Sequence, residues 1–460
     1  MDFKGKKVVI MGLGSYDQGS GIAAARFFAR AGAKVLVTDL KPKEVFVRQL
    51  KKLAGYRTIK YIFGKHRKID FQMADIIVKN PDVPVGSPYL AAARKRNIPI
   101  HNDWSIFFFF FNNPLVGVTG TRGKTTTATL LNEFLKEHYE TFLCGNVGVS
   151  PLAVIEKVKP GNVVVAELSS WNLQQLPAVK KGPHIAVITN LLVDHLNKYK
   201  NLNEYYKDKE NIFKYQTHGD FLVVNRDDAQ LRKRVKKARS RVFWFSQKPF
   251  AGDGVFVRGG NIVFRADGKE AVAANVSDVR LKGSHNLENI CAAVCAAMIT
   301  HVSPVHIKKV LRAFTGVSSR LELVREIGGV KYYNDTTATT PDAAIAALRA
   351  LKSKRMILLA GGTDKKLDYR AYAKEVKKRR PFLVLFAGTA ADKIRKELKN
   401  YSHILGVVQS MKEAMRMARP HIKKGDIVLL SPGAASFGIF KNEFDRGVQF
   451  VKEVHLLHKK

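Results

Sequence analysis

Residues 115–127 read LVGVTGTRGKTTT, and this stretch decides how the chain around it is expected to fold. An apolar strand runs into closely spaced glycines and then into a helix, expected over Ala128 to His138. Such a turn offers backbone N–H groups to phosphate oxygens, and the positive end of the helix points at them. Lys124 can bridge the β- and γ-phosphates of a nucleotide, and Thr125 can hold Mg²⁺. The stretch therefore predicts a phosphate-binding loop.

The loop departs at one position from the general nucleotide-binding pattern. Gly123 requires a glycine at position 118, where the chain has Val118, and Gly117 lies one residue too far away. A glycine-rich turn without a ligand is the less favoured alternative, because Gly-Lys-Thr directly after a strand is most often a phosphate loop. We therefore expect a reaction that depends on ATP or GTP.

The composition predicts a globular chain with an unusually high positive charge. The 460 residues suffice for about three domains, and 46% of them are hydrophobic. Lys and Arg number 78 against 39 Asp and Glu, a net charge of +39, which would suit nucleic acid or a membrane surface. The basic residues are scattered, however, and no aromatic and basic motif of an RNA-binding sheet is present. We favour a basic proteome or a site for several phosphates over nucleic acid, and interpret the run Arg232 to Arg241 as a solvated helix face.

Cysteine usage and apolar runs favour a reducing compartment. The three cysteines, Cys144, Cys291 and Cys295, show no metal-ligand spacing and are expected in the core. Phe107 to Phe111 is far shorter than the about 20 apolar residues that cross a bilayer, so we interpret it as a buried connector that ends the first domain. No signal peptide is expected before the first strand. We expect a cytoplasmic monomer without a membrane span.

The first domain, residues 1–112, is predicted to hold a Rossmann-like sheet. Its first strand ends in Gly12-Leu13-Gly14, and the next ends in Asp39, where such a fold holds a ribose. The insert Ser15 to Gly21 displaces the third glycine of the dinucleotide pattern, so a nucleotide diphosphate is expected rather than NAD. The turn at Asn80-Pro81 follows a later strand, at the edge where these sheets bind ligands.

The second domain, residues 113–316, is predicted to alternate strands and helices around a largely parallel sheet. Glu167 ends one predicted strand, Asn146 follows a second, and the block Asn190 to His195 follows a third. Carboxylate, imidazole and amide groups at one edge of a sheet suit hard cations beside phosphates. Each alone could be a helix cap or a satisfied core group. The metal interpretation therefore depends on their combination with Lys124.

Two further features belong to the later part of this domain. Gly259-Gly260 between two β-rich runs predicts a two-residue hairpin and an antiparallel side sheet. Asn286 and Asn289, three residues apart at the start of an Ala-rich helix, share one face of it. They could grip an adenine or ribose, or cap the helix.

The third domain, residues 317–460, again alternates strands and helices. Its polar loops are Asn334 to Thr339, Gly361 to Lys366 and Ser431 to Phe437. No low-complexity linker separates it from the rest of the chain.

In their order along the chain, these loops resemble the Mur ligase family of peptidoglycan precursor synthesis. Residues 119–126 are similar to the family's own phosphate loop, which accounts for the departure at Val118. The resemblance is nearest to the branch that adds D-glutamate to UDP-N-acetylmuramoyl-L-alanine. It implies an α/β fold with Rossmann-like N-terminal and C-terminal domains around a central P-loop ATPase domain. The likeness continues through Glu167–Ser170, Asn190–His195, Gly283–Asn289, Ser318–Glu322 and Leu429–Lys441.

The resemblance implies an ATP-dependent amide synthesis with two Mg²⁺ ions. The substrate carboxylate becomes an acyl phosphate, and the amino group of an amino acid then displaces phosphate. The family carbamylates a lysine downstream of its Asp-His pair; Lys209 is the best match here, and Lys207 competes. The implied catalytic residues are Lys124, His195 and Lys209, and the implied metal ligands are Thr125, Glu167, His195 and Lys209.

The resemblance also implies a binding set for each substrate, and closure of the third domain onto the nucleotide. For ATP the set is Gly120, Thr121, Arg122, Gly123, Lys124, Thr125, Thr126, Asn286, Asn289, Arg320 and Asp335. For the UDP substrate it is Gly14, Ser15, Asp39, Asn80, Pro81, Asn146 and Ser169. For the incoming amino acid it is Thr337, Thr339, Lys365, Ser436 and Phe437.

Two departures from the family pattern leave alternatives open. Thr337 stands where the D-glutamate-adding branch is expected to carry a lysine, so the charge that faces a dicarboxylate falls to Lys365. Asp82 stands where a glycine is expected in the uridine-nucleotide loop. The alternatives are a related ligase for another amino acid, such as a folylpolyglutamate synthase, and a basic nucleic-acid-binding ATPase. A nicotinamide-dependent dehydrogenase would leave Lys124 and Glu167 unexplained.

Overall fold

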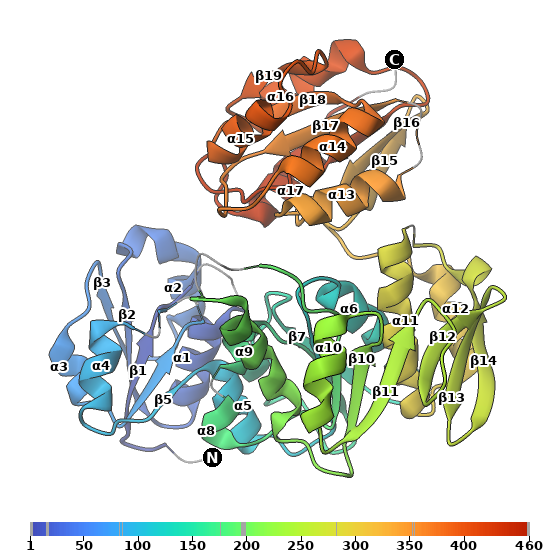
Figure 1. Ribbon diagram of the computed structural model, residues 1–460. Helices are drawn as coiled ribbons and strands as arrows, with labels where there is room; N and C mark the ends of the chain where they lie inside the picture. Colours follow the sequence, from blue (N-terminus) through green and yellow to red (C-terminus); the bar gives the residue numbers. More distant parts are fainter. Residues whose placement is uncertain are drawn as a thin grey trace. The chain divides into compact units, whose positions relative to one another are not determined.

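The computed structural model describes residues 3–14, 18–81, 83–84, 86–174, 176–194, 199–281, 283–351, 353 and 355–457 (Figure 1). Ser15, Asp82 and His195 therefore lie outside the described residues. The chain forms two compact units. One comprises Met1–Val193, Leu202–Val276 and Glu288–Val310, and the other comprises Asp194–Asn201, Ser277–Leu287 and Leu311–Lys460.

The first sheet has five parallel strands in the order β3-β2-β1-β4-β5, which confirms the Rossmann-like prediction. Helices α3 and α4 pack Phe71, Leu90 and Ala93 against Val9 and Ile77 on one face. The strands are β1 (Lys7–Met11), β2 (Lys34–Asp39), β3 (Ile59–Phe63), β4 (Ile76–Lys79) and β5 (Ile100–His101). The helices are α1 (Ser20–Arg30), α2 (Val47–Leu53), α3 (Lys68–Gln72) and α4 (Pro88–Arg94).

The phenylalanine run belongs to a helix rather than to an irregular connector. Helix α5 (Asp103–Phe110) begins with a capping box in which Asn102 and Ser105 satisfy each other's backbone N–H groups. Phe107 and Phe108 are buried, but Phe109 is 63% exposed. The predicted buried connector is thus wrong in part, because a helix turns consecutive side chains to different sides.

The second sheet has nine strands in the order β14-β13-β12-β11-β10-β9-β6-β8-β7. All neighbouring strands from β7 to β12 in this order pair in parallel. The β12–β13 and β13–β14 pairs are antiparallel. The strands are β6 (Leu115–Thr119), β7 (Thr141–Gly145), β8 (Val163–Glu167), β9 (Ile185–Ile188), β10 (Phe221–Asn225), β11 (Arg241–Ser246), β12 (Gly254–Arg258), β13 (Asn261–Ala266) and β14 (Lys269–Asn275).

The predicted hairpin at Gly259-Gly260 is confirmed, but its strands do not form a separate side sheet. Both glycines have positive φ angles, +57° and +76°, as a two-residue turn of this kind requires. β12 pairs in parallel with β11, so the hairpin extends the central sheet. The pairing of β12 with β11 requires a glycine at position 254, because a Cβ there would lie 1.8 Å from the Trp244 carbonyl oxygen.

The helices of this region bury apolar faces around the parallel strands. The basic run Arg232 to Arg241 is not one helix face, since it spans the end of α10, a 3-10 turn (Val235–Lys237) and the start of β11. The three cysteines are free and buried, as predicted, and burial raises the pKa of each thiol. The helices are α6 (Lys124–Leu135), α7 (Ser170–Leu173), α8 (Leu176–Val179), α9 (Leu202–Lys214), α10 (Ala229–Arg234), α11 (Ser284–Ile299) and α12 (Pro304–Ala313).

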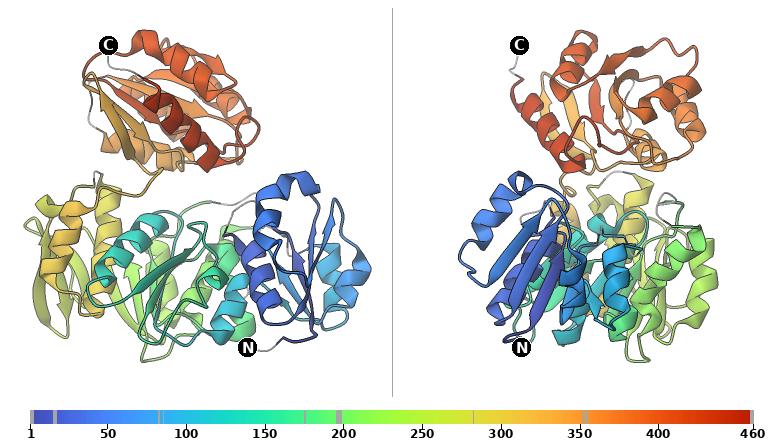
Figure 2. Two further views of the ribbon diagram at one scale, coloured as in Figure 1. Left: turned by 180° about the vertical axis from the view of Figure 1, so that it is seen from behind. Right: turned by 90° about the vertical axis from the view of Figure 1, so that its left-hand side faces the viewer.

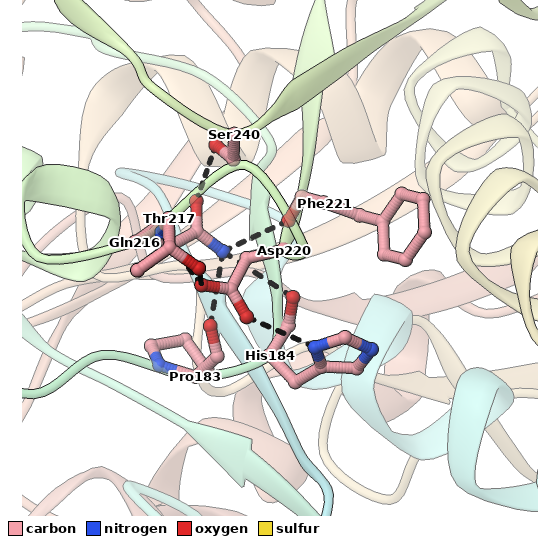
Figure 3. A network of polar contacts seen from close by, with 7 residues as sticks. All are labelled: Pro183, His184, Gln216, Thr217, Asp220, Phe221 and Ser240. Carbon is pink, nitrogen blue, oxygen red and sulfur yellow. Dashed lines mark hydrogen bonds and ion pairs between the residues drawn. The ribbon is translucent and has the colours of Figure 1, made fainter.

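A polar network around the buried Gln216 side chain lies at the amino-terminal edge of this sheet (Figure 3). The Gln216 side chain donates to the carbonyl oxygens of Pro183 and Phe221, both at 2.9 Å, and accepts from Ser240 Oγ at 2.8 Å. These partners precede or begin β9, β10 and β11, so one amide aligns three strands. His184 pairs with Asp220 at 2.9 Å on the exposed side of the network.

The third sheet has six strands in the order β15-β16-β20-β17-β18-β19, all parallel except β15. Helices α13, α14 and α15 pack on one face, and α16 and α17 on the other (Figure 2). The strands are β15 (Glu322–Ile327), β16 (Val330–Asn334), β17 (Met356–Gly361), β18 (Phe382–Phe386), β19 (Ile404–Val408) and β20 (Ile427–Leu430). The helices are α13 (Pro341–Ala350), α14 (Arg370–Arg379), α15 (Thr389–Glu397), α16 (Met411–Ala418) and α17 (Glu443–His455).

Within the described ranges, no helix is long and apolar enough to cross a membrane.

Candidate active site

The phosphate loop connects β6 to α6, and two of its glycines are required by close neighbours. Gly120 has a φ angle of +143°, and a Cβ there would lie 1.9 Å from Thr189 Oγ1. Gly123 has a φ angle of +83°, and a Cβ there would lie 2.0 Å from Asn289 Oδ1. The second contact brings the predicted ATP residue Asn289 of α11 against the loop.

The segment after β9 holds the loop in shape. The Thr121 N–H donates to the Asn190 carbonyl oxygen at 2.9 Å, and the Arg122 N–H donates to Asn190 Oδ1 at 2.8 Å. Thr121 Oγ1 in turn accepts from the Leu192 N–H at 2.9 Å. Asn190 and Leu192, from the predicted block 190–195, therefore help to hold the phosphate loop in shape.

Lys124 folds back over the loop and is placed to meet a phosphate. Its Nζ donates to the carbonyl oxygens of Gly120 and Thr121, both at 3.1 Å. Thr125 and Thr126 are buried in the first turn of α6, where the helix dipole favours anions. A bound phosphate would give Lys124 an acceptor stronger than a neutral carbonyl.

Lys209 of α9 lies against the same loop, whereas Lys207 is exposed. The Lys209 side chain is 2% exposed, and its Nζ donates to the Gly120 carbonyl oxygen at 2.8 Å. The same Nζ lies 4.8 Å from the centre of the Tyr205 ring. Of the two lysines considered for carbamylation, only Lys209 reaches the phosphate loop.

Glu167 ends β8, one strand away from the loop, with its backbone beside Val118. Its side chain is fully buried, and its Oε1 accepts from Asn146 Nδ2 at 3.0 Å. Among the described residues, its Oε2 has no hydrogen-bond partner. A buried carboxylate oxygen without a donor fits a bound cation such as Mg²⁺. In the described part of the chain, no group of three or more His, Cys, Asp and Glu side chains forms a metal site by itself.

The carboxyl ends of β1, β2 and β4 bring three predicted UDP-substrate residues together. Asp39 Oδ2 accepts from the Leu13 N–H at 2.9 Å, so this carboxylate holds the glycine turn itself. A Cβ at Gly14 would lie 2.9 Å from Asn80 Nδ2, so the Asn80 side chain covers the turn. Pro81 follows directly.

Two other residues predicted for the UDP substrate have structural partners. Asn146 bonds Glu167, as described above, and is exposed. Ser169 caps α7 and donates from Oγ to Asn172 Oδ1 at 2.7 Å. The capping alternative therefore describes Ser169 in this structure.

In the second unit, Asp335 is a buried acid at the carboxyl end of β16. It accepts from the Leu321 N–H at 3.2 Å and from Ser431 Oγ at 2.8 Å. Burial raises its pKa to about 7. Arg320 lies between Ser319 and Leu321, which have positive φ angles of +67° and +46°. Such strained backbone is typical of functional sites. Asn286 is buried on α11 and belongs to the same unit.

Three loops at the carboxyl edge of the third sheet carry the residues predicted for the amino acid. Lys365 Nζ donates to Thr339 Oγ1 at 3.1 Å. The Ser436 hydroxyl is buried and has no hydrogen-bond partner in the described part of the chain. Thr337 Oγ1 donates to the Ser319 carbonyl oxygen at 2.9 Å, and Phe437 has an exposed ring.

The sequence reasoning missed Arg446 in the first turn of α17. This guanidinium is fully buried and donates from Nη2 to the Thr336 carbonyl oxygen at 2.8 Å. A signal was available, because Arg446 occupies the helical stripe that continues with buried Phe450 and Val454. A charged residue on an apolar stripe indicates a specific partner.

These features define a class: a nucleotide-dependent α/β enzyme with a phosphate loop at the carboxyl edge of its central sheet. The family comparison then places the chain. Residues 6–102 match "Mur ligase MurD-like, N-terminal domain", residues 118–297 match "Mur ligase middle domain", and residues 319–433 match "Mur ligase, glutamate ligase domain". The chain belongs to the Mur ligase family.

Full-length relatives agree with this placement. A protein of Roseiflexus sp. (strain RS-1) named UDP-N-acetylmuramoylalanine--D-glutamate ligase is 41% identical, over 98% of both chains. A protein of Acidobacterium capsulatum with the same name is 37% identical, over 100% of this chain and 98% of its own.

Solved structures share the fold at low identity. UDP-N-acetylmuramate-alanine ligase MurC of Thermotoga maritima has a TM-score of 0.63 at 19% identity, over 98% of this chain and 99% of its own. MurF ligase of Thermotoga maritima, solved with ADP, has a TM-score of 0.59 at 20% identity, over 92% of this chain and 95% of its own. The predicted arrangement of three α/β domains, with the phosphate loop in the middle one, is confirmed.

Proposed function

We propose that the chain joins D-glutamate to UDP-N-acetylmuramoyl-L-alanine, with hydrolysis of ATP to ADP and phosphate. The structural observation that carries a ligase mechanism is the convergence of three groups on one sheet edge. The phosphate loop, the buried Lys209 and the unpartnered Glu167 Oε2 meet at the carboxyl ends of β6 and β8. The relatives named for this reaction support the choice of substrates.

In the proposed reaction, the substrate carboxylate attacks the γ-phosphorus and ADP leaves. The amino group of D-glutamate then attacks the acyl carbon, loses a proton and expels phosphate. Lys124 serves the first step by following the charge that shifts onto the β,γ-bridging oxygen. The loop N–H groups and the start of α6 hold the phosphates in line.

Two Mg²⁺ ions would supply charge neutralisation to this anion cluster when bound. Thr125 at the start of α6 and Glu167 at the end of β8 fit one ion, because Glu167 Oε2 has no other partner. We propose His195 and a carbamylated Lys209 for the other. A carbamate keeps one N–H on Nζ, so the bond to the Gly120 carbonyl oxygen can persist while the new carboxylate turns to the metal.

The remaining binding roles extend this proposal to the three domains. Residues 1–112 would bind the UDP group through Gly14, Ser15, Asp39, Asn80 and Pro81, with Asn146 and Ser169 from residues 113–316. Asn286, Asn289, Arg320 and Asp335 would hold ATP. Residues 317–460 would bind D-glutamate. We further propose that the enzyme is cytoplasmic and that it is a monomer. Light scattering tests the oligomeric state.

The amino-acid site should depend on Lys365, because Thr337 carries no charge and already bonds Ser319. Lys365 is positioned by Thr339, and the unpartnered Ser436 hydroxyl offers a donor to a carboxylate. Phe437 would contribute its backbone. A charge-assisted hydrogen bond contributes about 1.5–3 kcal/mol, so its loss should lower affinity about ten- to a hundredfold.

The test is phosphate release with UDP-N-acetylmuramoyl-L-alanine and a panel of amino acids. D-Glutamate should give the highest kcat/KM, and Lys365→Ala should raise its KM at least tenfold. Lys424→Ala, in an exposed turn before β20, is the matched control and should leave KM unchanged. Ligation of a neutral or dibasic amino acid without D-glutamate would overturn the substrate but keep the ligase class. Hydrolysis stimulated by nucleic acid would favour the competing ATPase class.

A further inference from the structure

The buried Arg446 lies where the three loops of the amino-acid site converge. Its Nε donates to Thr336 Oγ1 at 3.0 Å, and its Nη2 donates to the Thr336 carbonyl oxygen at 2.8 Å. Longer contacts of 3.4 Å reach the carbonyl oxygen of Ala434. Gly362 completes the set, since a Cβ there would lie 3.8 Å from Arg446 Nη1. One side chain thus bonds the loops after β16 and β20 and lies beside the loop after β17.

The surroundings of Arg446 are built to hold it in a single position. Gly447 brings α17 close to the first loop, where a Cβ would lie 2.7 Å from Thr336 Cγ2. Thr336 Oγ1 donates onward to the Glu443 carbonyl oxygen at 2.7 Å. The third and second loops are joined by the pair Thr363 and Ala435, with bonds of 2.9 and 3.0 Å.

A guanidinium is costly in such a place. The acceptors described above are a hydroxyl and two carbonyl oxygens rather than carboxylates, and burial lowers the pKa of Arg446 to about 9. An apolar residue would fill the stripe of Phe450 and Val454 at lower cost. The geometry, with a planar fork that bonds two backbone carbonyls, accounts for an arginine here.

We infer that Arg446 is a positioning residue for the incoming amino acid, which fixes the three loops that carry Thr337, Thr339, Lys365 and Ser436. This inference rests on the proposed function. Arg446 does not need to contact the substrate, because its acceptors are one residue from Thr337 and two from Ser436 along the chain. The hydrogen bonds to the Asp335 carboxylate come from Leu321 and Ser431 rather than from Arg446.

The test compares Arg446→Met with Arg355→Met. Arg355 precedes β17 at the opposite edge of the same sheet, where it pairs with Asp426 and donates to the His421 carbonyl oxygen at 2.8 Å. Both variants should lower Tm. Only Arg446→Met should raise the KM for the amino acid, at least tenfold, with the KM values for ATP and the UDP substrate within twofold of wild type. Equal effects of the two variants, or a common rise of all three KM values, would overturn the inference.

Two further measurements keep the test decisive. If Arg446→Met does not fold, Arg446→Lys keeps the charge but loses the two-carbonyl fork, and it should raise the amino-acid KM at least threefold. An unchanged KM in Arg446→Lys would also overturn the inference. The wild-type screen is run first, and if another amino acid proves to be the substrate, the same comparison is made with that amino acid. Failure of the proposed function is thereby separated from failure of this inference.

Discussion

Lys209 donates from Nζ to the carbonyl oxygen of Gly120 at 2.8 Å, so a buried cation of α9 touches the first residue of the phosphate loop. The contact joins two segments 89 residues apart in sequence. The carbamylation proposed above would change the charge of this side chain from positive to negative.

Carbamylation of Lys209 should make activity depend on CO₂ or bicarbonate. Lys209→Ala should lose most activity and regain part of it with acetate or formate, because a small carboxylate can fill the space of the carbamate. The measurement is phosphate release with and without these anions. Lys207→Ala, on the exposed side of α9, is the comparison; rescue of Lys207→Ala instead would reassign the modified residue.

Lys124→Ala should abolish ATP-dependent turnover and leave the fold intact. Lys124→Ala removes the two bonds from Nζ to Gly120 and Thr121, but the bonds to Asn190 and the conformations of Gly120 and Gly123 remain to shape the loop. Loss of one electrostatic stabiliser typically costs about 3 kcal/mol, so kcat should fall about a hundredfold or more. Circular dichroism and Tm serve as the folding check. Near-normal phosphate release would refute the assignment of this loop to ATP.

Gly123→Ala should disrupt the phosphate loop more than its single methyl group suggests. The new Cβ would lie 2.0 Å from Asn289 Oδ1, and the φ angle of +83° is strained for alanine. A cost of about 1–3 kcal/mol in stability is expected, together with weaker nucleotide binding. Gly55→Ala is the control, because no atom lies within 4 Å of a Cβ at that position. Equal Tm values and ATP affinities in both variants would contradict the described packing.

Asp335 should make stability fall as pH rises toward neutrality. Its pKa is about 7 in the folded chain against 3.8 ordinarily, so the folded state binds the extra proton between these values. The contribution of this group to the free energy of unfolding is therefore greatest below about pH 4. It decreases between about pH 4 and pH 7, by at most about 1.4 kcal/mol per pH unit. Asp335→Asn should flatten this part of the profile. Parallel urea-unfolding profiles for both proteins from pH 4 to 8 would contradict the burial of a protonated acid.

Gln216→Leu should destabilise the central sheet without touching the active site. The substitution leaves the carbonyl oxygens of Pro183 and Phe221 and the Ser240 hydroxyl without their partner (Figure 3). Buried groups left unsatisfied cost about 1–3 kcal/mol each when water cannot reach them. His184→Ala removes the exposed pair with Asp220 from the same network and should cost less than about 1 kcal/mol. Urea unfolding measures both, and a larger loss in His184→Ala would contradict the assigned roles.

Local chemistry explains which features the sequence could predict. A strand followed by Gly-Thr-Arg-Gly-Lys-Thr needs no distant partner to indicate a phosphate loop, and Gly259-Gly260 fixes a turn by backbone conformation alone. The hairpin pairs with β11, and no local sequence pattern predicts this pairing. Ser169 caps α7, and because a cap and a ligand contact use the same hydroxyl chemistry, the sequence does not separate the two roles.

Features formed by tertiary contacts were harder to predict. Lys209 and Lys207 differ little in sequence, and only the packing of α9 buries one of them. Arg446 was missed because its nearest acceptor, Thr336, lies 110 residues away along the chain. The helical periodicity places Arg446 on the same buried face as Phe450, but it does not indicate which residues Arg446 contacts.

The reaction rates of the three buried cysteines would report local opening of the folded chain. Cys144 lies on β7, and Cys291 and Cys295 lie on α11, all shielded from solvent and with thiol pKa values raised by burial. A thiol reagent must therefore wait for local opening before it reacts. The rate at Cys144 reports how often the edge of the central sheet opens, and the rates at the other two report the helix that carries Asn289. Added nucleotide should slow the reaction of Cys291 and Cys295, so the reactivity of these thiols would report ligand binding.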